Sequence, residues 1–265
     1  MDATLEELLN WLSQAGLERL TQLFVLVAAR LAPIVVLSPA FGGEALPQRL
    51  RVALIVGLAA GFGLALEPRF DRVDFARLVA LLGKELLVGG SIALLVRLSF
   101  DLVAACGALI DLGRGAALAS VLDPLSRQQS SALAQFLVLT FTALYFTIGA
   151  HSWVLGAVAR SLAAYPLDEL APPQLLGDGA VTAWIALAGE LLEAALTLSA
   201  PVLAIVFLLD GALGLAQRLA PSVQVFFLGA TVKGLVGVAV LLACAVALFD
   251  AFAARTATLL DGFAR

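Results

Sequence analysis

Uncharged apolar stretches dominate this sequence, and they constrain its fold more than any other feature. Of the 265 residues, 62% are hydrophobic and only 14% are charged, and the mean hydropathy is +1.02. A soluble domain needs roughly a quarter of its residues charged, whereas a helix that faces lipid or another helix needs no charge. The composition therefore predicts an all-α integral membrane protein.

Six apolar segments are expected to be helical. They cover about 23–41, 52–66, 78–112, 132–150, 180–209 and 223–253. Prolines predict a kink in the first segment, and the second is shorter than the ~20 residues that an upright spanning helix requires. The third is either one long helix or a hairpin bent near Gly89 and Gly90. The last two are long enough to protrude beyond the lipid.

Charged residues inside these segments are a second constraint, because each costs about 2.5–3.5 kcal/mol at a bilayer centre unless it faces a cavity or another protein surface. Arg97 and Asp101 stand at i,i+4, and Asp111 and Arg114 at i,i+3. These spacings place each pair on one helix face, where the charges can neutralise each other.

Glu190 and Glu193 differ, because they are like charges at i,i+3 with no basic residue nearby in the sequence. They require either an outside partner or a proton. We favour hydrogen bonding at a buried or interfacial position. A proton relay usually includes His or Lys in neighbouring helices, and the only histidine is His151.

The sequence offers no pattern typical of an enzyme. It has no G-x-S-x-G elbow, and His151 has no second His or Cys at ligand spacing, which favours a structural imidazole. The net charge of −4 and the scattered arginines argue against a nucleic-acid partner. We therefore expect no catalytic residue, no metal and no cofactor. Glycines at 57–63 and 83–90 are expected to be helix-packing contacts.

Three separated motifs occur in one order along the chain. The first is R-x-x-P-x-x-x-x-x-P-x-F-G, from Arg30 to Gly42, and the others lie within 107–166 and 201–233. Together they resemble the FliR/SctT family of type III secretion export-gate proteins. The resemblance implies long, kinked helical hairpins packed in a hetero-oligomeric export gate, rather than a simple six-helix transmembrane bundle.

The resemblance also implies a location and partners. The chain would be a multi-pass protein of the bacterial inner membrane, partly within the basal body of the secretion system. It would contact SctR/FliP-like, SctS/FliQ-like and SctU/FlhB-like subunits, membrane lipid and secreted protein substrates in transit. One domain is expected over 1–265, with N-terminal helices at about 1–165 and a C-terminal helical hairpin at about 180–265.

By motif, the channel plug of the family falls on 113–124. Small residues there allow close packing at an axis, apolar residues allow a constriction that gates by dewetting, and an Asp-Pro pair suits the start of a helix. The expected plug residues are Gly113, Gly115, Ala116, Leu118, Ser120, Val121, Leu122, Asp123 and Pro124. Without the resemblance, an ordinary helix–loop–helix with a capped second helix is preferred.

Other polar residues are expected to serve subunit interfaces or internal structure. They are Arg30, Arg97, Asp101, Asp111, Arg114, Glu190, Glu193, Asp210, Arg218 and Lys233. Arg218, Pro221 and Lys233 resemble a C-terminal family pattern, although Ser222 stands where glutamine is common. Lys233 resembles the injectisome branch more than the flagellar branch. These residues either dock neighbouring subunits or form a polar hairpin tip, and both interpretations stay open.

Three classes of function compete. The favoured one is a non-enzymatic channel subunit that helps to form and close a conduit for unfolded protein substrates. The alternative is a secondary transporter that uses Glu190 and Glu193 in a midplane site. The short second segment and the lack of evident internal repeats argue against it. A membrane-embedded enzyme would require a cluster of catalytic residue types, which the sequence does not offer.

Overall fold

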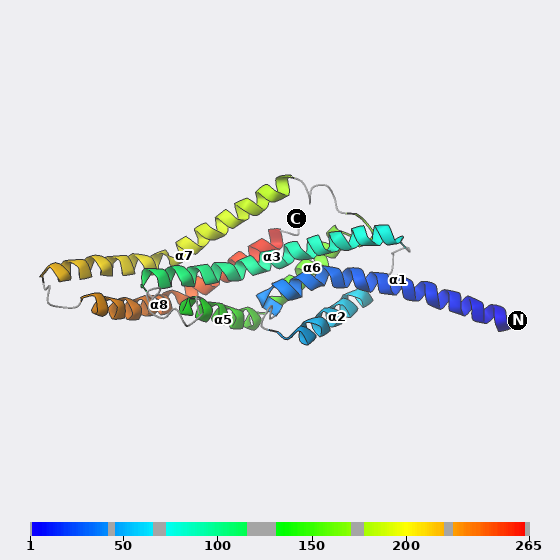
Figure 1. Cartoon of the computed structure of the whole chain (residues 1–265), viewed down its shortest axis with the longest axis horizontal. Helices are drawn as coiled ribbons and strands as arrows, with labels where there is room; N and C mark the ends of the chain where they lie inside the picture. The colour runs from blue at the N-terminus through cyan, green and yellow to red at the C-terminus, as the bar shows by residue number, and fades with distance from the viewer. Residues whose placement is uncertain are drawn as a thin grey trace. The chain divides into compact units, whose positions relative to one another are not determined.

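The computed structural model describes residues 2–41, 46–65, 73–115, 131–170, 178–219 and 225–262. In these ranges the chain is helical apart from short turns, and no strand is present (Figure 1). The elements are α1 (Asp2–Leu37), η1 (Pro39–Phe41), α2 (Gln48–Ala65), α3 (Phe75–Gly113), α5 (Ala132–Thr147), α6 (His151–Ala164), α7 (Asp178–Leu219) and α8 (Val225–Gly262).

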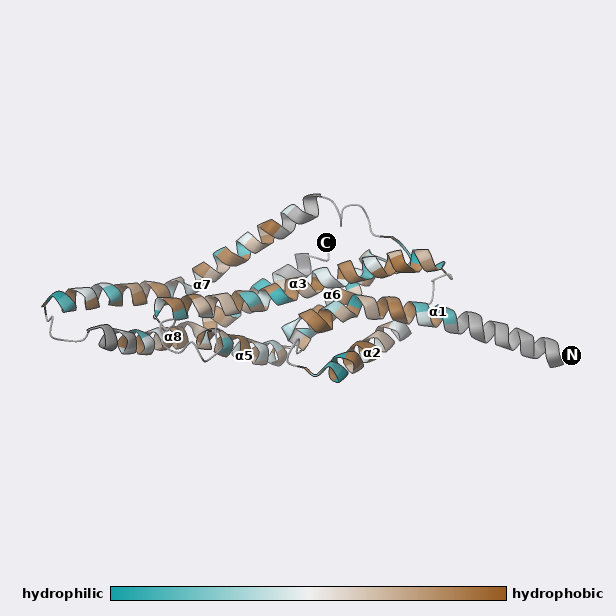
Figure 2. Ribbon diagram, viewed as in Figure 1, coloured by the Kyte–Doolittle hydropathy of each residue, from teal (hydrophilic) through white to brown (hydrophobic). Residues whose placement is uncertain are grey.

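The predicted all-α membrane protein is confirmed by the length and hydropathy of these helices. Four stretches of the described chain are long and apolar enough to cross a membrane: Glu18–Leu37, Phe75–Gly113, Ile185–Leu219 and Thr231–Thr258. Figure 2 shows hydrophobic residues along most of the length of these helices, with hydrophilic residues interspersed. In the described part of the chain, the number of helices that could cross a membrane is therefore four, or five with the bent pair described next.

The fourth predicted segment, 132–150, forms α5 and a turn, and a second helix, α6, follows it at an angle. α5 ends at Thr147 and α6 begins at His151, with an angle of 69° between them. Gly149 in the connecting turn has a φ of +74°, a left-handed conformation that favours glycine. The apolar pattern of 132–150 predicts one segment and gives no sign of a bend at Gly149.

α3 is one helix of 39 residues, which decides between the two alternatives that the sequence left open. The helix continues through Gly89, so no hairpin forms there, and this glycine lies at a close helix contact. A Cβ atom at Gly89 would collide with the backbone carbonyl of Arg30 on α1. The expected packing role therefore holds for Gly89, while the Cβ positions of Gly83 and Gly90 face open space within this chain.

α1 joins the N-terminal region to the first apolar segment in one helix. It continues through Pro33 and ends at Leu37, one residue before Ser38. The α conformation is disfavoured for a residue that precedes proline, and Ser38 precedes Pro39. The chain then turns into η1, and α1 packs against α2.

The chain divides into two compact units. Unit 1 comprises Met1–Arg97, His151–Ala180 and Thr258–Arg265, and unit 2 comprises Leu98–Ala150 and Val181–Ala257. α3 contributes to both units, so neither is a continuous stretch of sequence. The expectation that the whole chain forms a single domain stays a prediction.

The core of unit 2 contains an aromatic cluster. Phe141 on α5 lies with its ring centroid 5.0 Å from that of Phe100 on α3 and 5.8 Å from that of Phe252 on α8. Tyr145 lies 5.5 Å from Phe100, also by centroid distance. Edge-to-face contacts of this kind stabilise beyond simple area burial, and here they join three helices.

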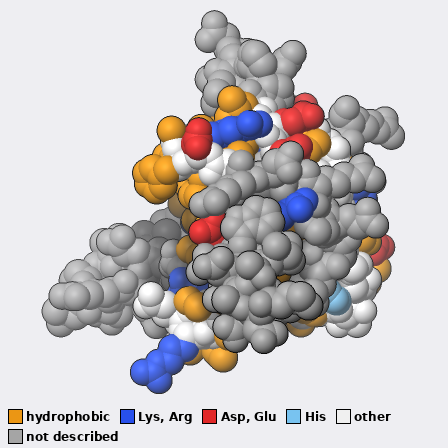
Figure 3. Space-filling model, turned by 90° about the vertical axis from the view of Figure 1, so that its right-hand side faces the viewer, with side chains coloured by type: hydrophobic (Ala, Val, Ile, Leu, Met, Phe, Trp, Pro, Cys, Tyr) orange, Lys and Arg blue, Asp and Glu red, His pale blue; other side chains and the backbone are white. Residues whose placement is uncertain are grey.

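Many large hydrophobic side chains lie on the surface of the chain rather than in these cores. Figure 3 shows hydrophobic side chains open on the surface beside charged ones. The exposed set includes Phe75, Phe207, Leu219, Leu235 and Val246. Large exposed apolar surfaces mark contact with membrane or with other proteins.

Candidate functional site

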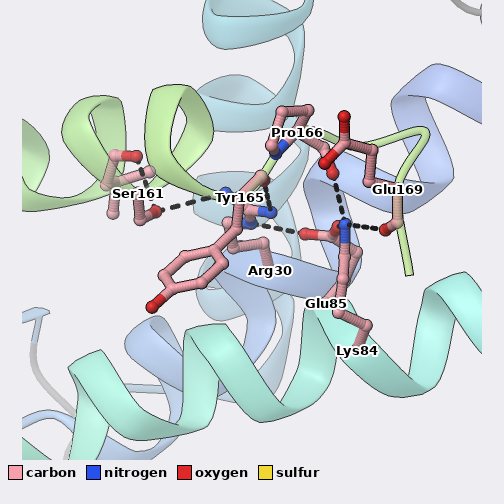
Figure 4. A network of polar contacts seen from close by, with 8 residues as sticks. Arg30, Lys84, Glu85, Ser161, Tyr165, Pro166 and Glu169 are labelled. Atoms are coloured by element: carbon pink, nitrogen blue, oxygen red, sulfur yellow. Dashed lines mark hydrogen bonds and ion pairs between the residues drawn. The ribbon is translucent and has the colours of Figure 1, made fainter. Parts of the chain in front are cut away.

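A buried network of charges lies in unit 1 around Arg30 (Figure 4). The Arg30 side chain is 0% exposed, and its Nε donates to the carboxylate of Glu85 on α3. Nη1 donates to Ser161 Oγ on α6 at 3.2 Å, and Nη2 donates to the Tyr165 carbonyl oxygen at 2.7 Å. Each of the three guanidinium nitrogens therefore has an acceptor within this chain.

Lys84 completes the network from the neighbouring position on α3. Its Nζ lies 2.7 Å from Glu85 Oε1 and donates to the carbonyl oxygens of Pro166 and Glu169, the latter at 2.9 Å. One buried carboxylate thus stands between two buried cations. Backbone carbonyl oxygens from 165–169 accept the remaining hydrogen bonds and partly compensate the excess positive charge. The network ties α1, α3, α6 and the loop after α6 together.

The sequence analysis singled out Arg30 but not Lys84 and Glu85 as site residues. The sequence does contain a signal for a buried charge cluster, because two adjacent opposite charges, Lys84 and Glu85, interrupt the apolar segment 78–112. The partners could not be named, since Arg30 and Glu85 are 55 residues apart and Arg30 and Ser161 are 131 apart.

A second polar cluster joins the two ends of segment 116–130, in unit 2. The Asp111 carboxylate, near the end of α3, pairs with Arg114. Its Oδ2 also accepts from Ser131 Oγ at 2.5 Å and from the Leu133 backbone N–H at 3.0 Å. Ser131 is the N-cap of α5, and its Oγ accepts from the Ala134 N–H at 3.0 Å. We call Asp111, Arg114 and Ser131 the loop anchor.

The loop anchor also contacts α8. Arg114 Nη1 donates to the Gly234 carbonyl oxygen at 3.3 Å. The Arg114 side chain packs so closely on Gly237 that a Cβ there would collide with it. Gly107 is in equally close contact with the Ala134 backbone. The end of α3 and the start of α5 are therefore held together and against α8.

Two of the predicted plug residues lie in the described part of the chain. Gly113 is the last residue of α3, and a Cβ there would lie 2.7 Å from the Leu203 side chain of α7. Gly115 has a φ of +76°, the left-handed conformation typical of a residue after a helix end. The other predicted plug residues lie outside the described residues: Ala116, Leu118, Ser120, Val121, Leu122, Asp123 and Pro124.

Glu190 on α7 has a partner that the sequence pattern does not indicate. Arg255 on α8 donates to Glu190 Oε2 at 3.0 Å, and the two side chains are 38% and 59% exposed. Glu190, Arg255 and Glu193 all line one groove on the surface of unit 2. The partner lies 65 residues further along the chain, so no helical spacing indicated it.

The remaining predicted polar residues are spread along α3, α7 and α8. Lys233 Nζ lies 2.8 Å from Asp210 Oδ1, which links α7 and α8. Arg218 is exposed in the last turn of α7, and Arg97 and Asp101 are exposed on α3. Pro221 and Ser222 lie outside the described residues. Among the described side chains, no group of three His, Cys, Asp or Glu is placed to hold a metal ion.

Comparison with known proteins covers nearly the whole chain and both polar clusters. Residues 21–259 match the model of the family "Bacterial export proteins, family 1". The chain belongs to this bacterial export family. The resemblance to FliR/SctT proteins is thereby confirmed, and so is the assignment to type III secretion and protein export.

The names of its relatives refer to flagellar biosynthesis, to translocation of Yop proteins and to surface presentation of antigens. The chain is 29% identical to the flagellar biosynthetic protein FliR of Bacillus subtilis over 85% of this chain and 87% of that protein. It is 30% identical to the Yop proteins translocation protein T of Yersinia pestis over 69% of this chain and 71% of that protein. It is 26% identical to the surface presentation of antigens protein SpaR of Shigella flexneri, over 81% of this chain and 82% of that protein.

Proposed function

We propose that this chain is a non-enzymatic subunit of the inner-membrane export gate of a type III secretion system, where it helps to form and close the channel for unfolded protein substrates. The observation that carries the proposal is the family match over 21–259. The apolar spans and the exposed hydrophobic side chains support a position among membrane-embedded subunits. The partners are SctR/FliP-like, SctS/FliQ-like and SctU/FlhB-like proteins.

The plug of this gate is the loop of 113–124. The loop anchor supports this role because it holds together the residues on either side of 116–130, the segment in which most of the loop lies. A plug must hold its position while the channel is closed, and a carboxylate with three donors provides such a fixed base. Gly115, with its left-handed φ of +76°, ends the helical conformation at the start of the loop.

The injectisome is the favoured branch over the flagellum. Lys233 supports this choice, since it resembles the lysine of the injectisome branch and forms an ion pair with Asp210. The identities of 29% and 30% to a flagellar and a Yop translocation relative favour neither branch.

Deletion of this chain from its own bacterium tests the proposal. We expect loss of the secreted proteins from the culture medium with unchanged swimming motility. Loss of motility with normal secretion would assign the chain to a flagellum instead. Restoration by the wild-type chain provides the control, and copurification with the three partner types tests assembly. Normal secretion and motility in the deletion strain would overturn the proposal, as would a purified chain that transports a small solute on its own.

A further inference from the structure

A groove of about 500 Å³ runs along α7 and α8 in unit 2. Its lining combines charged, small and apolar side chains. The residues that form it are Leu102, Glu190, Glu193, Ala194, Thr197, Leu198, Ala251 and Arg255. Ala194 and Ala251 leave room for another helix to approach, as small residues do where membrane helices pack together.

The groove carries an excess of negative charge. Glu190 and Glu193 contribute two carboxylates, and Arg255 contributes one guanidinium, which is 3.0 Å from Glu190. Within the described part of the chain, no hydrogen bond or ion pair reaches the Glu193 carboxylate; the neighbouring Thr197 hydroxyl donates to the Glu193 backbone carbonyl instead. The groove therefore has one carboxylate that no described residue of this chain neutralises.

Both helices that form the groove are poorly covered by the rest of the chain. In the most apolar window of each span, 28% of the residues are buried in α7 and 22% in α8, against 56% in α3. Glu193 lies within the apolar stretch Ile185–Leu219. A carboxylate in such a stretch is costly against lipid tails and normally faces a protein partner.

From this charge and shape we propose that the groove docks a membrane helix of another gate subunit, which presents a lysine or arginine to Glu193 among small side chains. The inference rests on the proposed function and names the chemistry of one subunit contact. The cation completes a four-charge arrangement with Glu190, Glu193 and Arg255, so that the net charge of the groove falls to zero. A lipid occupant would leave the Glu193 carboxylate without a protein cation.

Photo-crosslinking in the assembled complex tests the occupant. A benzophenone amino acid at Thr197 or Leu198 is expected to crosslink to one subunit, in a helical peptide that contains Lys or Arg. The same probe at Val246, which is exposed on α8 outside the groove lining, is the control position and is not expected to give this crosslink. Crosslinks from the groove to lipid alone, or to a peptide without a basic residue, would overturn the inference.

Charge reversal tests the contact itself. Glu193→Lys is expected to lower the yield of the copurified partner at least tenfold, and Glu193→Gln to lower it less. Reversing the crosslinked Lys or Arg to Glu in the partner should restore the Glu193→Lys complex. Asp250→Lys reverses an exposed charge of α8 that does not line the groove, and it should leave the yield unchanged.

The outcomes separate this inference from the proposed function. A wild-type chain that joins no gate subunit would contradict the proposed function. Wild-type and Glu193→Lys chains that both assemble at equal yield would contradict the docking groove alone. Because Glu193→Lys can reduce folding, its thermal unfolding as an isolated chain is compared with that of the wild type. If the Glu193→Lys chain is well folded but the Lys-to-Glu or Arg-to-Glu change in the partner does not restore the complex, the contact is also contradicted.

Discussion

The Arg30–Glu85 pair of unit 1 and the Glu190–Arg255 pair of unit 2 use charges in apolar helices in opposite ways. In unit 1, Arg30 and Glu85 are 0% exposed, and side chains and carbonyls of this chain surround them. In unit 2, the Glu190–Arg255 pair is open at the surface, and Glu193 lines the groove beside it. The same residue types therefore hold the chain together in the first pair and remain accessible to other molecules in the second.

The difference matters because exposure decides what an ion pair contributes to stability. Removing one partner of a buried pair leaves an uncompensated charge and costs about 3–5 kcal/mol. Exposed pairs contribute only about 0–1 kcal/mol. Stability of the isolated chain and yield of the complex should accordingly respond to different substitutions.

The largest effect is expected from Glu85→Ala, which leaves Arg30 and Lys84 buried without their carboxylate. Unfolding free energy should fall by about 3–5 kcal/mol, measured by thermal or denaturant unfolding in detergent and by protein level in membranes. Glu190→Ala is the matched control, because its carboxylate also pairs with an arginine but is exposed. Equal destabilisation by the two substitutions would break the comparison between the units.

The next effect is expected from Gly89→Ala, since the added Cβ would collide with the Arg30 carbonyl and push α1 away from α3. Overpacking of this kind costs about 1–3 kcal/mol. Gly90→Ala is a close control, because a Cβ there meets nothing within 4 Å. It should be neutral or stabilise by roughly 0.5–1 kcal/mol through helix propensity. A Gly89→Ala chain as stable as Gly90→Ala would show that the close approach is not required.

Asp111→Ala is expected to loosen the loop anchor, because Ser131, Leu133 and Arg114 lose a common acceptor. A donor left without a partner costs about 1–3 kcal/mol. If 113–124 is the plug, the membrane should also become more permeable to small molecules while the complex persists. Dye or ion leakage measures this effect, and Asp210→Ala is the control with an exposed carboxylate. A sealed membrane with Asp111→Ala would contradict the role of the anchor in closure.

The smallest effect on the isolated chain is expected from Lys233→Gln, which removes the ion pair with Asp210. Its unfolding free energy should change by only about 0–1 kcal/mol. If Lys233 docks a neighbouring subunit, the yield of complex should fall much more than this stability change explains. A variant with normal complex yield would favour the interpretation of Lys233 as part of a polar hairpin tip.

Several features of the fold were predictable because they depend on local sequence. The Asp111–Arg114 pair follows from i,i+3 spacing on one helix, and it is present. The long C-terminal hairpin follows from two overlong apolar segments, which form α7 and α8. By contrast, the bend between α5 and α6 at Gly149 was missed, since a single glycine in an apolar run equally suits a helix contact or a turn.

The sequence by itself determined the class of this protein. Its long apolar segments require helices in a membrane environment, and three motifs in one order along the chain resemble one export family. Only the tertiary structure decided which charges meet. Arg30 pairs with Glu85 and Ser161, and Glu190 pairs with Arg255, across separations of 55 to 131 residues. Hydropathy and helical spacing act within a few turns, whereas these pairings depend on how helices pack against each other. The same packing leaves Glu193 in an open groove, and no local pattern encodes that exposure.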